Sequence, residues 1–367
     1  MRVLFRRVWV LLGLVLGGLV LGQGVPVITG LNGPMGLLFA PDGRLYVVDY
    51  GVGGDTVVEM NSPEPQGPKV MAKVGLSSRV LRLEPDGTVQ LVATFPSMVF
   101  ARETSWASRL AWFGGLLVTS GGWSNPDQAP MPLMAVLARV GPEGPVKLAD
   151  FWAFEKAHNP DGHGVESHPY GLTVGADGYI YVADAAANTL LRVNPSTGAV
   201  SLVAAFAGIP GPSANPARGG AMEMDPVPTA VVARGGVFYV SLLSGLPFLK
   251  GASKVVRVVG GRVEDYATGA TMLTDLQEGP DGNLYAVRMA ETGERGPIPG
   301  TGAVLRVRPG GFEVVIQGLP FPTALAIAPS GDFYVTINGV GAPGSGAVLR
   351  FANPIRFRTH WERHEAL

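Results

Sequence analysis

The sequence predicts an all-β fold, a six-bladed β-propeller, and three observations support this prediction. A phrase made of a small apolar strand, a tight turn and a strand rich in tyrosine and valine recurs six times along the chain, and four of the copies begin at a proline. The 52 glycines are scattered at turns and form no tracts. After residue 22 no stretch shows the apolar period of a helix. Units of four short strands repeated at this spacing are typical of propellers.

The first element, residues 1–22, is expected to be a signal peptide. Arg2, Arg6 and Arg7 precede an apolar run of 14 residues from Val8 to Leu21. A basic start followed by a short apolar segment is the pattern of a secretory signal, and about 20 residues are needed to span a bilayer. We therefore expect a secreted or periplasmic protein that begins near Gln23 and is not stably inserted in a membrane after cleavage.

The repeats define the blades of the expected propeller. The first copy runs from Pro34 to Asp49 and the third from Pro169 to Asp184. The second copy, which begins at Ser108, is degenerate, and the others begin at Pro228, Thr274 and Pro322. Each copy is followed by a strand with an arginine near its end, and these arginines are Arg82, Arg139, Arg192, Arg257, Arg306 and Arg350. Because every blade has this arginine, we interpret it as architectural.

Short polar residues mark the turns between the expected strands. Asp42, Asp86 and Asp281 each stand in a Pro-Asp-Gly sequence, which is hairpin chemistry and does not indicate a metal site. Asp184 and Asn188 follow an inner hairpin, where short side chains cap turn backbone. All five residues are therefore predicted to be structural.

The last blade lacks its outer strand, which predicts how the ring closes. Five copies continue past their arginine strand into another strand, but the sixth stops near Phe351. A spare strand, Val25–Leu31, stands at the other end of the chain. We expect this strand to complete the last blade and cover its open edge. The propeller would then span residues 23–353, with a C-terminal tail at 354–367.

Two long motifs resemble a known family. They run from Asn159 to Val193 and from Val227 to Val258. With these motifs the chain resembles the ScyD/ScyE family of exported, NHL-like six-bladed propellers. The family pattern has asparagine where this chain has His168. The resemblance implies a propeller fold and export, and it implies no activity.

Composition excludes several classes of function. The formal net charge is -1, with a pI near 6.5, so no basic field is available to collect nucleic acid. The absence of cysteine excludes disulfide frameworks, thiolate metal sites and cysteine nucleophiles.

The ligand-binding candidates are residues where one blade departs from the others. Asp275, Gln277 and Glu278 lie in an inner strand whose counterparts in blades 1, 3, 4 and 6 are small and apolar. His168 and Tyr170 lie where the chain enters blade 3. We expect these five residues to share one pocket at the channel mouth, because outer-to-inner connections and the starts of inner strands lie on the same face.

The sequence predicts no metal site, although the connection into blade 3 contains weak candidates. His158, His163 and Glu166 carry groups that bind divalent ions, but the five-residue spacing of the histidines suits neither a helix nor a single strand. The positions beside the leading proline, expected to ring the channel mouth, contain no carboxylate: they are Met35, Ser108, Tyr170, Thr229, Thr274 and Thr323.

These observations favour a binding or scaffolding protein that presents its channel mouth to a small molecule, a glycan or a protein. No catalytic residue can be assigned, and no cofactor is predicted. The alternative is a hydrolase of the lactonase type that depends on a divalent metal such as calcium, for which Asp275 and Glu278 are the nearest carboxylates. A quinone-dependent dehydrogenase is less favoured, because convergent basic and histidine side chains are not evident.

Overall fold

The computed structural model describes residues 24–60, 69–100, 103–122, 126–127 and 131–355. Antiparallel strands make up most of these ranges, which confirms the all-β prediction. The predicted signal peptide and nearly all of the predicted tail lie outside the described residues. Among the described residues, no helix has the length and apolar character needed to cross a membrane.

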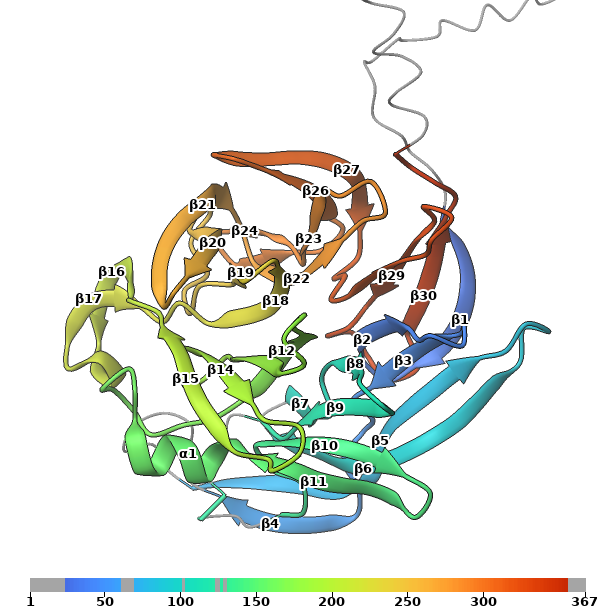
Figure 1. The fold of residues 1–367 in the computed structure, drawn as a ribbon, viewed down its shortest axis with the longest axis horizontal. Helices are drawn as coiled ribbons and strands as arrows, with labels where there is room; N and C mark the ends of the chain where they lie inside the picture. The colour runs from blue at the N-terminus through green and yellow to red at the C-terminus, as the bar shows by residue number, and fades with distance from the viewer. Residues whose placement is uncertain (1–23, 61–68, 101–102, 123–125, 128–130, 356–367) are drawn as a thin grey trace, which may run out of the picture.

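The sheets stand around a central axis, with β2, β8, β12, β18, β22 and β28 as their innermost strands (Figure 1). The first sheet contains β2 (Pro34–Phe39), β3 (Leu45–Asp49), β5 (Val70–Leu83), β6 (Val89–Phe100) and β7 (Glu103–Trp106), with β4 (Thr56–Met60) paired to β5. The next contains β8 (Leu110–Trp112), β9 (Leu116–Ser120), β10 (Val136–Gly141) and β11 (Gly144–Asp150). It is followed by β12 (Pro169–Val174), β13 (Ile180–Asp184), β14 (Thr189–Val193) and β15 (Val200–Ala205).

The second half of the chain continues in the same way. One sheet contains β18 (Pro228–Arg234), β19 (Val237–Leu242), β20 (Ser253–Val259) and β21 (Arg262–Ala270). Another contains β22 (Leu273–Glu278), β23 (Leu284–Arg288), β26 (Gly302–Arg308) and β27 (Gly311–Leu319). The last contains β28 (Leu325–Ile327), β29 (Phe333–Ile337), β30 (Gly346–Phe351) and, at its outer edge, β1 (Val25–Leu31). Two hairpins lie apart from these sheets: β16 (Ile209–Asn215) with β17 (Ala221–Met224), and β24 (Glu291–Gly293) with β25 (Gly296–Ile298).

The innermost strands contact one another in a cycle. Each strand contacts the next in the order β2, β8, β12, β18, β22 and β28, and β28 contacts β2. At the outer edge β1 pairs antiparallel with β30, so that Val25 lies opposite Arg350 and Leu31 opposite Gly346. The first and last described strands of the chain therefore belong to one sheet.

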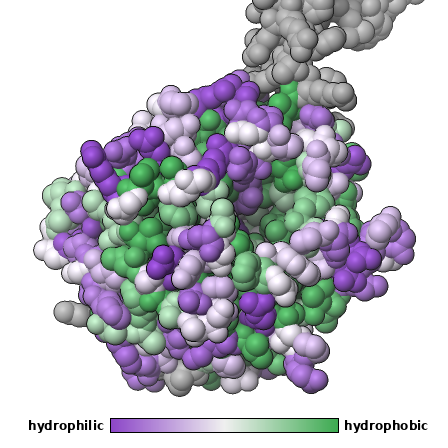
Figure 2. Space-filling view, viewed as in Figure 1, coloured by the Kyte–Doolittle hydropathy of each residue, from purple (hydrophilic) through white to green (hydrophobic). Residues whose placement is uncertain are grey.

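Apolar residues pack between neighbouring sheets, so the core is divided among the sheet interfaces. Val240 of β19 and Tyr181 of β13 belong to one such cluster, and Val287 of β23 packs with Val335 of β29 in another. The innermost strands approach closely: a Cβ at Gly36 would lie 2.5 Å from the carbonyl oxygen of Ser108. Outside these interfaces, hydrophobic residues are interspersed with hydrophilic ones on the face shown in Figure 2.

One helix departs from the expectation of a chain without helices. Helix α1 (Phe151–His158) follows β11, and Asp150 caps it by accepting a hydrogen bond from the Ala153 N–H at 2.9 Å. Asn159 ends it in the left-handed conformation. Eight residues are too few for a clear helical period, whereas the cap and the burial of Phe151 and Trp152 are sufficient to hold the helix. A single 3₁₀ turn, η1 (Pro216–Arg218), is also present among the described residues.

The turn residues behave as predicted. Asp42, Asp86 and Asp281 each accept a hydrogen bond from the backbone N–H two residues later, which is the Asx-turn arrangement. The side chain of Asp184 accepts hydrogen bonds from the N–H groups of His168 and Ala187.

The repeated arginines contact groups of their own sheets, as an architectural role requires. Arg82 binds Glu84, Arg139 donates to the carbonyl of Phe113, and Arg192 lies over the ring of Tyr179. The other three pair with carboxylates: Arg257 with Glu264, Arg306 with Asp281, and Arg350 with Asp332.

Candidate functional site

A cavity of about 450 Å³ lies on the axis where the innermost strands begin, and we call it the first cavity. Five of the six positions beside the leading prolines line it: Met35, Tyr170, Thr229, Thr274 and Thr323. The sixth, Ser108, places its Oγ 3.3 Å from the hydroxyl of Tyr50, which also lines the cavity. The alignment of the repeats therefore identified the residues around this opening.

Hydroxyl groups tie neighbouring sheets together around the first cavity. Thr323 Oγ1 donates to the carbonyl of Pro34 at 2.5 Å, and Thr229 Oγ1 donates to the carbonyl of Leu273 at 2.9 Å. Thr119 Oγ1 makes the equivalent bond to the carbonyl of Tyr170 at 2.6 Å. Each bond satisfies a buried carbonyl of the next innermost strand, so these hydroxyls stabilise the ring.

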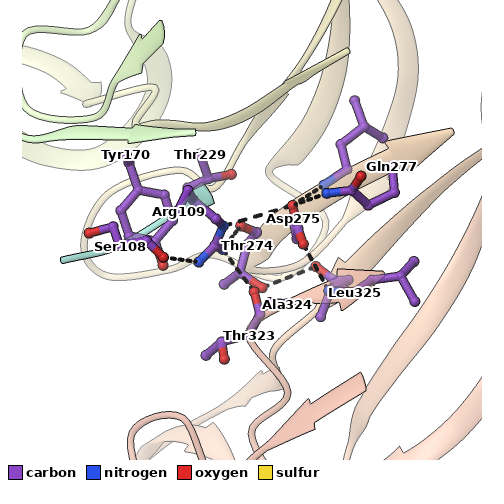
Figure 3. Close-up of polar contacts among 12 residues, drawn as sticks. Ser108, Arg109, Tyr170, Thr229, Thr274, Asp275, Gln277, Thr323, Ala324 and Leu325 are labelled. Atoms are coloured by element: carbon purple, nitrogen blue, oxygen red, sulfur yellow. Dashed lines mark hydrogen bonds and ion pairs between the residues drawn. The ribbon is translucent and has the colours of Figure 1, made fainter. Parts of the chain in front are cut away.

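Beneath the first cavity, one arginine reaches across the axis, and we call this level of the channel the Arg109 layer (Figure 3). Arg109 precedes β8 and is 4% exposed. Its Nη2 donates to the carbonyls of Thr274 at 2.7 Å and Thr323 at 2.9 Å, which lie in β22 and just before β28, and neither of these strands is adjacent to β8. The guanidinium carbon lies 4.4 Å from the centre of the Tyr170 ring. One side chain therefore connects four sheets.

Asp275 is the counter-charge of Arg109. It is 1% exposed, and its Oδ1 lies 3.9 Å from Nε of the arginine. Its carboxylate also accepts hydrogen bonds from the N–H groups of Leu276 at 2.9 Å and Leu325 at 2.8 Å. Burial raises the pKa of Asp275, while the Arg109 charge and these hydrogen bonds act in the opposite direction. The side chain is thus part of a buried structural pair.

A second cavity of about 920 Å³ opens on the other side of this pair. Arg109, Asp275, Gln277 and Glu278 all line it, and none of them lines the first cavity. His168 and Tyr170 line only the first. The expectation that these candidates share one pocket is therefore wrong, because β22 runs along the axis and carries its polar residues past the Arg109 layer.

The two remaining polar candidates of β22 are engaged at the second cavity. Gln277 Nε2 lies 3.4 Å from Asp275 Oδ1. Glu278 forms an ion pair with Arg234 at 3.1 Å, and its side chain is 43% exposed. The polar side chains of β22 thus interact with other residues of the channel wall.

His168 is buried in the wall of the first cavity. It is 3% exposed, and its ring meets the Tyr170 ring edge-on at 5.4 Å between centroids. Burial, with a smaller contribution from the Arg109 charge, lowers the pKa of His168 to about 3. Burial likewise raises the pKa values of Tyr50 and Tyr170. All three side chains are therefore neutral at physiological pH.

The weak metal candidates His158, His163 and Glu166 lie in the connection between β11 and β12, where the carboxylate of Asp161 accepts hydrogen bonds. His158 ends α1, with Nδ1 2.9 Å from the carbonyl of Phe154. Asp161 accepts hydrogen bonds from the His163 N–H at 3.0 Å and from Asn188 Nδ2 at 2.9 Å. Burial raises the pKa of Glu166, and the nearby Asp225 charge adds to this. Within the described ranges, no group of three or more His, Asp or Glu residues is placed to hold a metal ion.

Sequence reasoning missed Arg109 and Glu155. The second repeat is degenerate, and its Arg109 was a visible departure from the apolar rule, although nothing local shows that the side chain crosses the axis. Glu155 lies in α1 at 2% exposure, and burial, followed by the charges of Asp184, Asp161 and Glu166, raises its pKa to about 8. No signal for this burial is present in the helix sequence.

Solved structures resemble most of the chain, although their sequences differ from it. No protein-family model matches the chain, and neither does any curated protein. A candidate oxidoreductase (glucose dehydrogenase) from Thermus thermophilus is similar over 90% of this chain and 99% of its own, with a TM-score of 0.52 and 18% identity. A luciferin-regenerating enzyme is similar over 88% of this chain and 92% of its own, with a TM-score of 0.50 and 11% identity. These likenesses establish a β-propeller fold and carry no activity to this chain.

Proposed function

We propose that this protein is an exported six-bladed propeller, closed by β1, that binds a small molecule in its first cavity. Export and membership of the ScyD/ScyE family are parts of this proposal and rest on the sequence. The cycle of innermost strands and the pairing of β1 with β30 support the six blades and their closure.

The observation that supports binding is the first cavity itself. Its volume of about 450 Å³ falls in the range of about 300 to 1,000 Å³ that is typical of ligand pockets. It is walled by Tyr50, Phe100, Tyr170 and Phe248 together with several hydroxyl groups. Concave, mostly apolar sites with a few polar groups are where proteins bind small molecules.

The same cavity does not favour the metal-dependent hydrolase. Such an enzyme needs carboxylate or imidazole ligands that converge on one ion. The described lining of the first cavity contains no carboxylate, and its one histidine, His168, is engaged with the Tyr170 ring. The carboxylates Asp275 and Glu278 are on the far side of the Arg109 layer.

A thermal-shift screen of small molecules tests the proposal, because a ligand that binds only the folded state raises the melting temperature. The decisive variant is Met289→Trp, which fills the first cavity from a partly exposed position. Met71→Trp is the matched control, since Met71 is 61% exposed on β5 and lies outside the cavity. We expect the shift to survive in the control and to be lost in Met289→Trp.

A ligand shift that persists in Met289→Trp would place binding elsewhere and overturn the proposal. Elemental analysis of the purified native protein addresses the alternative. Stoichiometric calcium or zinc would favour the hydrolase. Export is tested separately by N-terminal sequencing of the extracytoplasmic protein, which should begin near Gln23.

A further inference from the structure

The first cavity offers no charged group to a ligand. Among the described residues that line it, none is Asp, Glu, Lys or Arg. Its titratable side chains are Tyr50, His168 and Tyr170, and burial moves each of their pKa values toward the neutral form. The wall is therefore uncharged over the physiological pH range.

The positive charge of Arg109, which lies over the Tyr170 ring, is already satisfied outside the first cavity. Its guanidinium donates to two backbone carbonyls and is covered by the ring of Tyr170. The opposite charge of Asp275 lies 3.9 Å away. Arg109 lines the second cavity and not the first. An anion in the first cavity would therefore find no cation to contact.

The physical consequence is a strong preference between ligand classes. An ion moved from water into such a cavity loses hydration without gaining a counter-ion, at a cost of several kcal/mol. A neutral apolar molecule instead gains about 25 cal/mol for each Å² of apolar surface that it buries.

The walls also indicate the shape and polarity of the ligand. Met35, Met272 and Met289 line the cavity, and methionine side chains adapt to irregular apolar molecules. Thr229, Thr274 and Thr323 add hydroxyl-bearing side chains to the lining. Val340, which is 57% exposed, extends the apolar lining to the surface. The cavity thus provides a broad apolar wall interspersed with a few hydroxyl-bearing side chains.

We propose that the first cavity takes an uncharged, largely apolar small molecule. This inference rests on the proposed function, because it names the class of molecule that the same cavity would bind. The inference goes beyond the proposed function in one respect: it requires the ligand to be uncharged.

Two fluorescent probes with the same aromatic body test the inference. N-phenylnaphthylamine is neutral, and anilinonaphthalene sulfonate adds one negative charge to the same ring system. Fluorescence titration of the full-length mature protein should show that the neutral probe binds at least about tenfold more tightly. Its binding should be lost in Met289→Trp and retained in Met71→Trp.

A charge placed at the entrance should reverse the preference. Val340→Lys should weaken the neutral probe and strengthen the sulfonate, because the new ammonium group is a counter-ion at the cavity wall. Val146→Lys is the matched control, since Val146 is also 57% exposed and lies on β11, outside the cavity. The control should leave both affinities unchanged.

The outcomes separate the two proposals. If the sulfonate binds as tightly as the neutral probe and Met289→Trp abolishes both, the cavity binds ligands but the uncharged class is wrong. If the binding of both probes is unaffected by Met289→Trp, the proposed function fails as well. If only the neutral probe binds, and only through the cavity, both proposals are supported.

Discussion

The two ends of the channel differ in chemistry although the same innermost strands form both. The first cavity is uncharged and lined by aromatic, methionine and hydroxyl side chains. The second contains Arg109, Asp275 and Glu278. The difference arises at one layer, where Arg109 crosses the axis and binds carbonyls of distant sheets. A single buried cation can therefore divide a channel into two environments, and only one of them has the character of a ligand pocket.

The largest effect is expected from removing that layer. Arg109→Met leaves Asp275 buried without its counter-charge and two carbonyls without a donor, so stability should fall by about 3 to 5 kcal/mol. Chemical denaturation measures this. The double variant Arg109→Met with Asp275→Asn should recover part of the loss, because it removes both charges. If the losses in the double variant simply add, Arg109 and Asp275 are not coupled.

The second prediction concerns His168, which is neutral in the wall of the first cavity. His168 has a folded-state pKa of about 3 against an ordinary value of 6.5, so the unfolded chain binds more protons between these values. The contribution of neutral His168 to the free energy of unfolding is therefore complete above pH 6.5, and it declines as the pH falls toward about 3.

Denaturation at neutral and acidic pH measures this contribution. His168→Asn should flatten the acid limb of the stability profile. His158→Gln, which replaces an exposed histidine, should leave that limb unchanged. Parallel profiles for wild type and His168→Asn would show that His168 is protonated in the folded protein.

A smaller effect is expected from the hydroxyls that join the sheets. Thr323→Val removes the bond to the carbonyl of Pro34 and should cost about 1 to 2 kcal/mol, since a buried acceptor loses its donor. Thr268→Val, at an exposed position on β21, should change stability by less than about 0.5 kcal/mol. Equal losses in the two variants would mean that the hydroxyl of Thr323 does not stabilise the ring.

The smallest effect is expected at the second cavity. Glu278→Gln breaks a partly exposed ion pair with Arg234 and should change stability by less than about 1 kcal/mol. Titration with N-phenylnaphthylamine should give the wild-type affinity, because the substitution lies beyond the Arg109 layer. A weakened affinity would show that the two ends of the channel communicate.

The fold could be predicted because its information is local and repeated. Tight turns that contain glycine and alternating strands recur in each unit, and alignment of the units placed Met35 and Thr323 around one opening. The Arg109 layer could not be predicted in this way. Arg109 binds carbonyls 165 and 214 residues later in the chain, and backbone carbonyls leave no trace in a sequence. Asp275 was identified as unusual, but the sequence did not show that it lines the second cavity, because that depends on its buried partner Arg109.

The pairing of β1 with β30 also has a consequence for how the molecule assembles. It joins residue 31 to residue 346, so one of the first strands to be synthesised can acquire its partner only when nearly the whole chain is available. Contacts between such distant residues slow folding, because the intervening chain must be ordered before they are gained. Until β1 pairs with it, β30 presents an unpaired edge to other chains. A circular permutant that places β1 directly after β30 would convert this pairing into a local hairpin, and we expect it to refold faster and to aggregate less on the way.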